Sequence, residues 1–124
     1  MRNFKEHIIS NVATLKRALA ALDRLGSDAI LFVVDDDNKL IGSLTDGDVR
    51  RGLLKGKSLE ESVLHYIQPH PKSVNKTDYS LSEIIKLRGQ YFKVLPVLDA
   101  DKRIINVINF RYQKSYLPLD ALLM

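Results

Sequence analysis

The segment with the clearest chemical potential runs from Gly42 to Leu54. It reads Gly-Ser-Leu-Thr-Asp-Gly-Asp-Val-Arg-Arg-Gly-Leu-Leu, and its pattern predicts the end of a strand and the start of a helix. A helix start leaves backbone N–H groups unpaired and carries the positive end of the helix dipole, which suits a phosphate. Thr45 adds a hydroxyl, and Asp48 adds a carboxylate that can accept hydrogen bonds from both hydroxyls of a ribose. The pattern therefore indicates a turn that binds a phosphorylated sugar.

The same two residues also have a purely structural interpretation. Thr45 and Asp48 stand three positions apart, as in a capping box, with Asp in place of the usual Glu or Gln. Such a cap needs no ligand, and spacing alone favours it. The neighbouring Arg50 and Arg51 either reach a ligand phosphate or face solvent, and the sequence leaves both alternatives open.

Other polar clusters are weaker candidates for a site. Asp35 to Asn38 resemble the start of a calcium loop, but Lys39 follows where an acidic or amide residue is needed, so a hairpin turn is favoured. His65 and His70 are separated by a predicted helix end and have no third ligand, and His7 is expected at the surface. The sequence predicts no metal site and no required cofactor.

The composition is that of one soluble folded domain. The chain has 124 residues, no cysteine, and 45% hydrophobic and 27% charged residues. Its longest wholly apolar run, Ala29 to Val34, is six residues and cannot cross a membrane, and charged residues near the N-terminus argue against an export signal. The net charge of +4 is spread among residues of both signs without a basic stretch interleaved with aromatics. A cytoplasmic protein that binds neither nucleic acid nor membrane is expected.

An internal repeat organises the chain. Leu31 to Asp37 falls on Leu95 to Asp101 at an offset of 64 residues (95 − 31), and Ile8 to Leu19 falls on Val74 to Ile85 at an offset of 66 (74 − 8). A unit of about 60 residues has little core of its own, so two units packed as a pseudo-twofold pair are expected. Such a pair has clefts in which small ligands can bind.

Periodicity and turn residues predict the same order of elements in each half. In the first half we expect a helix between Thr14 and Gly26, strands at Ile30 to Val34 and Leu40 to Leu44, a helix ending near Gly56, and a short helix opened by Ser58-Leu59-Glu60-Glu61. In the second half we expect a helix starting near Leu81 and strands at Val94 to Leu98 and Ile104 to Ile108.

The string from Leu40 to Arg50, placed after a helix and an apolar hairpin, resembles the ligand signature of cystathionine-β-synthase-type (CBS) domains. The resemblance to a tandem CBS pair, or Bateman module, covers nearly the whole chain. It implies an α/β (α+β) fold of two βαββα-type repeats, residues 1–68 and 69–124, with short sheets flanked by helices.

The resemblance also implies a ligand and its contacts. In this family the threonine of the signature contacts phosphate and the aspartate holds the ribose of an adenine nucleotide, while the base lies against the first hairpin strand. Carried onto this chain, the implied ligand is AMP, ADP or ATP. The implied binding residues are Ala29, Ile30, Ser43, Thr45, Asp46, Asp48 and Arg50.

The second repeat departs from the signature. At the offset of 64 residues, Asn106, Asn109 and Tyr112 stand where the first repeat has glycine, threonine and aspartate. A tyrosine lacks the paired acceptors that a ribose diol needs. The sequence therefore predicts one competent cleft and one degraded cleft.

The implied function is regulatory and non-catalytic. The module would bind a nucleotide in the cleft between its repeats and control an attached or separate enzyme. The version with Asp-Gly-Asp followed by two arginines resembles CBS pairs that precede sugar-1-phosphate nucleotidyltransferase domains. A homodimer formed through exposed helices is expected. The alternative is a ligand-free dimerisation or assembly module of such an enzyme.

Overall fold

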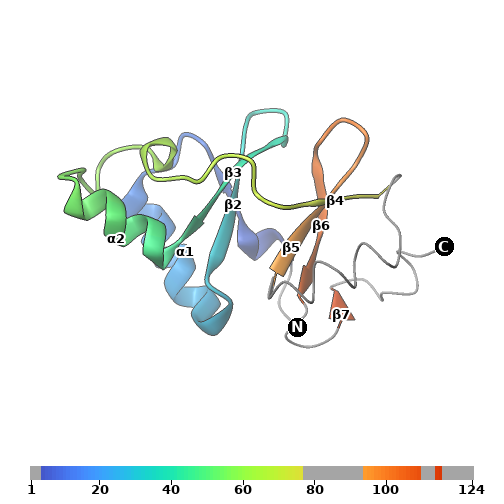
Figure 1. Ribbon diagram of the computed structural model, residues 1–124, viewed down its shortest axis with the longest axis horizontal. Helices are drawn as coiled ribbons and strands as arrows, with labels where there is room; N and C mark the ends of the chain where they lie inside the picture. The colour runs from blue at the N-terminus through green and yellow to red at the C-terminus, as the bar shows by residue number, and fades with distance from the viewer. Residues whose placement is uncertain (1–3, 77–93, 110–113, 116–124) are drawn as a thin grey trace. The chain divides into compact units, whose positions relative to one another are not determined.

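The structure is a computed structural model that describes residues 4–76, 94–109 and 114–115. Two compact units divide the chain: the first is Lys5–Pro71, and the second combines Met1–Phe4 with Lys72–Met124. The expected boundary after residue 68 lies three residues before this division (71 − 68). Figure 1 shows the elements of each unit.

The first unit has the βαββα order and a three-stranded sheet. Its strands lie in the order β1-β2-β3, with β1 parallel to β2 and β2 antiparallel to β3. The expected mixed α+β class is thus confirmed. The elements are η1 (Phe4–His7), β1 (Ile8–Ser10), α1 (Leu15–Leu25), η2 (Gly26–Asp28), β2 (Ile30–Val34), β3 (Leu40–Thr45), α2 (Asp46–Leu54) and η3 (Val63–His65).

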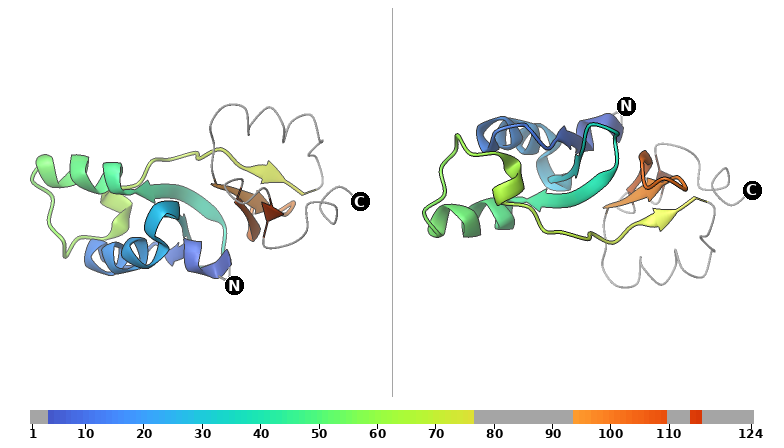
Figure 2. Two further views of the ribbon diagram at one scale, coloured as in Figure 1. Left: turned by 90° about the horizontal axis from the view of Figure 1, so that it is seen from below. Right: turned by 90° about the horizontal axis from the view of Figure 1, so that it is seen from above.

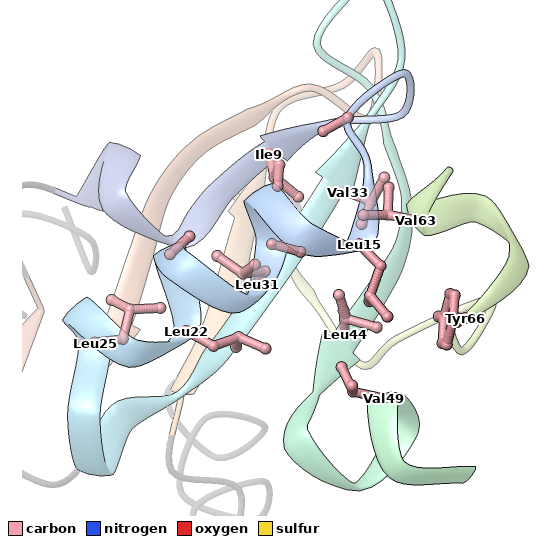
Figure 3. Close-up of a cluster of buried hydrophobic side chains, with 13 residues drawn as sticks. Ile9, Leu15, Leu22, Leu25, Leu31, Val33, Leu44, Val49, Val63 and Tyr66 are labelled. Carbon is pink, nitrogen blue, oxygen red and sulfur yellow. The ribbon is translucent and has the colours of Figure 1, made fainter. Parts of the chain in front are cut away.

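Helix α1 begins and ends where its local signals predict. The Thr14 hydroxyl accepts a hydrogen bond from the Arg17 N–H (3.3 Å), and Gly26 ends the helix with a φ of 63° that favours glycine. The apolar face of α1 is buried against β2 and β3, as Figure 3 shows. The core also takes in Val49 of α2 and Val63 and Tyr66 beyond it. The sheet and both helices therefore share one hydrophobic core.

The helix expected from Ser58 is not formed. Residues 59–60 form a turn, and only the three-residue helix η3 follows. The reason is that the carbonyls of Leu59 and Glu61 accept hydrogen bonds from the N–H groups of Lys16 and Leu15 at the start of α1 (3.0 and 2.9 Å). These first-turn N–H groups lack partners within their own helix, so the segment pairs with α1 and does not coil on itself. Figure 2 shows η3 lying between α1 and α2.

The second unit repeats the hairpin. Its described strands are β4 (Val74–Asn75), β5 (Val94–Leu98), β6 (Ile104–Asn109) and β7 (Lys114–Ser115), in the order β4-β5-β6-β7. The helix expected near Leu81 lies outside the described residues.

The two hairpin turns match at the level of single hydrogen bonds. The Asp35 carboxylate accepts from the N–H groups of Asp37 and Lys39, and the Asp99 carboxylate accepts from those of Asp101 and Arg103. Both ladders also shift register at the equivalent place, after Val33 and after Val97. The repeat offset of 64 residues therefore also holds in the structure of the two hairpins, and the Asp35 carboxylate stabilises a hairpin turn. Within the described ranges no group of acidic or histidine side chains could hold a metal ion.

The offset in the lead-in strand is 65, not the expected 66. Ile9 pairs with Val33 in the first unit, and Val74 pairs with Val97 in the second (74 − 9 = 65). Both Ile9 and Val74 are buried, so the pairing follows burial of an apolar side chain.

No described helix is long and apolar enough to span a bilayer.

Gly52 provides a test of the packing between α2 and the segment after it. A Cβ on Gly52 would collide with the ring of Tyr66, which is buried and donates its hydroxyl to the Ser58 carbonyl (2.9 Å). Gly→Ala in a free helix interior stabilises by about 1 kcal/mol. We expect Gly52→Ala to lower the free energy of unfolding by about 2 kcal/mol in urea denaturation.

The control is the same change without the tyrosine ring. In a Tyr66→Ala background, Gly52→Ala should be neutral or stabilising because the obstacle is gone. A loss of the same size in both backgrounds would contradict the packing argument.

Candidate functional site

The site lies where β3 ends and α2 begins. Thr45 is the N-cap residue of α2, and it forms a capping box with Asp48. The Thr45 N–H and hydroxyl both donate to Oδ2 of Asp48 (2.9 and 3.0 Å), and the Asp48 N–H donates to the Thr45 hydroxyl oxygen (3.4 Å). The structural interpretation of this pair is therefore realised in the structure.

The second carboxylate oxygen of Asp48 has different partners. Nη2 of Arg51 donates to Oδ1 at 2.6 Å, and Nε2 of Gln68 donates to the same oxygen at 3.1 Å. The Asp48 side chain is 3% exposed, whereas that of Arg51 is 54% exposed. Oδ2 thus stabilises the start of α2, whereas Oδ1 accepts hydrogen bonds from two side chains, Arg51 and Gln68, that come from different parts of the chain.

Gln68 is a site residue that the sequence analysis missed. Its backbone N–H and carbonyl pair with the carbonyl and N–H of Ser43 in β3 (2.9 Å each). This pairing needs a glycine at position 42, because a Cβ there would lie 2.6 Å from Cδ1 of Ile67. No local signal marks Gln68, which lies 20 residues from Asp48.

The structure distinguishes the two neighbouring arginines. Arg51 contacts Asp48, whereas Arg50 is exposed. Helix geometry explains the difference, because residues three apart share a face and residues two apart do not. The guanidinium of Arg51 also lies against Gly47, where a Cβ would be 3.3 Å from Nη1. The spacing rule, applied to the sequence, would have selected Arg51.

The strand expected to read a base lies beside this turn. Ile30, at the start of β2, pairs with Thr45 in the β2–β3 ladder. The Ile30 carbonyl also hydrogen-bonds with Nδ1 of His7 (2.9 Å). His7 is completely buried, so the expectation of a surface position was wrong. The sequence analysis missed this contact because the two residues are 23 positions apart.

The remaining predicted residues differ in exposure. Ser43 is buried, and both of its backbone groups pair with Gln68. Asp46 is exposed in the first turn of α2, and Ala29 is partly buried just before β2. The turn thus brings Ile30, Thr45 and Asp48 together, with Asp46 at its outer side.

The second repeat presents amides at the equivalent positions. Asn109 is buried and pairs with Val94 in the ladder, as Thr45 pairs with Ile30. Asn106 is 1% exposed, and in the described part of the chain neither its amide nitrogen nor its amide oxygen has a hydrogen-bond partner. Tyr112 lies outside the described residues.

Comparisons with known proteins agree with this architecture. Residues 7–55 match the family model of the CBS domain. An uncharacterised protein of Helicobacter pylori (strain J99) is 40% identical over 117 residues, which are 92% of this chain and 34% of that protein. Arabinose 5-phosphate isomerase KdsD of Pseudomonas aeruginosa is 29% identical over 77% of this chain and 29% of its own length. The chain therefore spans about a third of the length of these relatives.

A solved structure shares the fold. The crystal structure of CBSX2 in complex with AMP superposes with a TM-score of 0.69 and 25% identity, covering 88% of this chain and 85% of that one. The cytosolic domain of the Mg2+ channel MgtE in complex with ATP also shares the fold, with a TM-score of 0.65 and 27% identity, covering 86% of this chain and 43% of that one.

The contacts of Asp48 predict its contribution to stability. Asp48→Ala removes the cap acceptor and leaves the Thr45 N–H and the Gln68 amide without their acceptor. We expect a loss of about 2 kcal/mol in the free energy of unfolding, measured by urea denaturation. The ion pair with Arg51 contributes only part of this figure, because the arginine side chain is 54% exposed.

Asp46→Ala is the matched control, since it removes an exposed carboxylate from the same helix turn. Its expected cost is about 0.5 kcal/mol, from the helix dipole alone. Equal costs for the two variants would argue against the network around Asp48.

Proposed function

We propose that this chain is a regulatory CBS pair that binds an adenine nucleotide at the turn formed by Thr45 and Asp48. The observation that carries the proposal is the placement of a buried carboxylate, that of Asp48, at the start of α2. This helix start lies directly beside Ile30, the first residue of β2. The AMP complex of CBSX2, a protein with the same fold, supports this class of ligand.

The phosphate group would lie at the N-terminus of α2. Backbone N–H groups and the helix dipole favour an anion there, and Thr45 is partly exposed at the same point. The first turn also carries Asp46 and Asp48, whose charges oppose a phosphate. Arg50 and Arg51 lie in the next turn of the helix, and their two positive charges balance the two negative charges of these carboxylates. The local net charge therefore does not oppose a phosphate.

The sugar and the base would use Asp48 and the start of β2. A ribose diol can donate two hydrogen bonds, and Oδ1 is the oxygen whose two present donors it could replace, because Oδ2 holds the helix cap. Main-chain groups of Ala29 and Ile30 would face the base. Ser43 would contribute its hydroxyl, since its backbone groups pair with Gln68.

The regulatory effect would follow from linkage. A ligand that binds only the folded module stabilises it, and at a concentration 100 times its dissociation constant the gain is about 2.7 kcal/mol. Such a ligand favours whichever conformation of an attached enzyme best fits the bound module.

The regulated enzyme would act on a sugar phosphate. The sequence resemblance suggested a sugar-1-phosphate nucleotidyltransferase, and the relative KdsD is an arabinose 5-phosphate isomerase. Both act on a phosphorylated sugar, and the relatives are about three times as long as this chain. We further propose a homodimer through α2, where Leu53 and Leu54 are 42% and 81% exposed.

One observation favours the alternative function of a ligand-free assembly module. Both oxygens of Asp48 already accept hydrogen bonds from Thr45, Arg51 and Gln68, so the turn is complete without a ligand. If no adenine nucleotide binds and the protein is still a dimer by analytical ultracentrifugation, this alternative replaces the nucleotide proposal.

Isothermal titration with AMP, ADP and ATP tests the nucleotide proposal. Asp48→Asn keeps a carbonyl oxygen for the cap but removes the charge and replaces the oxygen that would accept from the ribose by an NH2 donor. We expect the variant to bind the preferred nucleotide at least about tenfold more weakly, which corresponds to 1.4 kcal/mol. Asp37→Asn, in the exposed hairpin turn, is the matched control and should bind within twofold of the unmodified protein. Equal affinity of Asp48→Asn and the unmodified protein would rule out the ribose role.

A further inference from the structure

We propose that Arg51 makes this site selective for phosphorylated nucleotides over nucleosides, by exchanging its contact with Asp48 for one with the ligand phosphate. The inference rests on the proposed function, because it concerns the same turn.

One carboxylate oxygen of Asp48 already accepts two hydrogen bonds. Oδ1 of Asp48 accepts from Nη2 of Arg51 at 2.6 Å and from Nε2 of Gln68 at 3.1 Å. These N–H donors present to the carboxylate the same chemistry as the hydroxyl donors of a ribose. Any sugar that binds through Oδ1 must therefore replace at least one of them.

Of the two donors, Arg51 is the one that can leave. Its side chain is 54% exposed, and only one of its nitrogens contacts Asp48 in this ion pair. Gln68 is held more firmly, because its backbone forms two hydrogen bonds with Ser43. A ligand would thus displace the guanidinium before it displaces the amide.

The displaced guanidinium is already beside the expected phosphate position. It lies against Gly47 in the first turn of α2, at the end of the helix that favours an anion. Any side chain at position 47 would crowd it, because a Cβ would be 3.3 Å from Nη1. A guanidinium also matches a phosphate through two parallel hydrogen bonds, which a single carboxylate oxygen cannot provide.

The exchange has opposite consequences for two kinds of ligand. A nucleotide breaks the contact between Arg51 and Asp48 but supplies a phosphate as a new partner. A nucleoside breaks the same contact and supplies none, so its binding is opposed by the lost charge-assisted hydrogen bond. Arg51 therefore widens the difference in affinity between AMP and adenosine.

The test compares AMP and adenosine by isothermal titration on the full chain. The unmodified protein should bind AMP at least tenfold more tightly than adenosine. Arg51→Met keeps the aliphatic part of the side chain and removes the charge and the donors. We expect this variant to bind AMP more weakly and adenosine equally or more tightly, so that the affinity ratio falls at least fivefold. Arg17→Met removes the same charge from an exposed position of α1, outside this turn, and should keep the ratio within twofold.

The outcomes separate the inference from the proposed function. An unchanged ratio in Arg51→Met, or an equal fall in Arg17→Met, overturns the role of Arg51 while nucleotide binding stands. Absence of AMP binding to the unmodified protein overturns the proposed function and this inference together. Should Arg51→Met fail to fold by circular dichroism, Arg51→Gln provides the same comparison, with the same result expected and the same result overturning it.

Discussion

The carboxylate of Asp48 is the interaction on which the first repeat depends. It is almost completely buried, and a buried charge is tolerated only when its oxygens are hydrogen-bonded. Asp48 belongs to α2, and Oδ2 joins this helix to the end of β3 through Thr45. Oδ1 contacts Arg51 in the next turn of α2 and joins the helix to the segment before Pro69 through Gln68. A single side chain thus ties together the strand, the helix and the chain that leaves the repeat.

Elements with local signals could be predicted from the sequence. Helix α1 lies between Thr14 and Gly26 as expected, because a hydroxyl cap and a glycine in the left-handed region each act within a few residues. The hairpins follow the predicted strands to within one residue, and aspartates at equivalent positions make the same turn in both repeats. The pairing of Thr45 with Asp48 belongs to this class as well, because both partners lie in one helix turn.

Contacts between distant residues could not be predicted in the same way. The Ser58 segment carries a correct capping signal, and its Glu61 side chain does accept from the Ser58 N–H (2.5 Å). Its carbonyls nevertheless pair with the start of α1, where the N–H groups of Leu15 and Lys16 have no acceptor within their own helix. Gln68 and His7 are similar cases, since their partners lie 20 and 23 positions away. The sequence thus predicted the cap formed by Thr45 and Asp48, but not the contacts that Gln68 and His7 make with the site.

Gly42 marks one difference between the described parts of the two repeats. At position 42 the absence of a Cβ lets Ile67 and Gln68 approach β3, and that approach delivers the Gln68 amide to Asp48. Asn106 stands at this place in β6, so the second sheet has a side chain where the first has none. On the side away from β5, β6 pairs with β7 at Ile108 and Asn109, one position beyond the equivalent of Ser43 (43 + 64 = 107). The two described sheets thus share a hairpin but differ in the segment that pairs with its second strand, and a buried amide stands where the first repeat has its glycine.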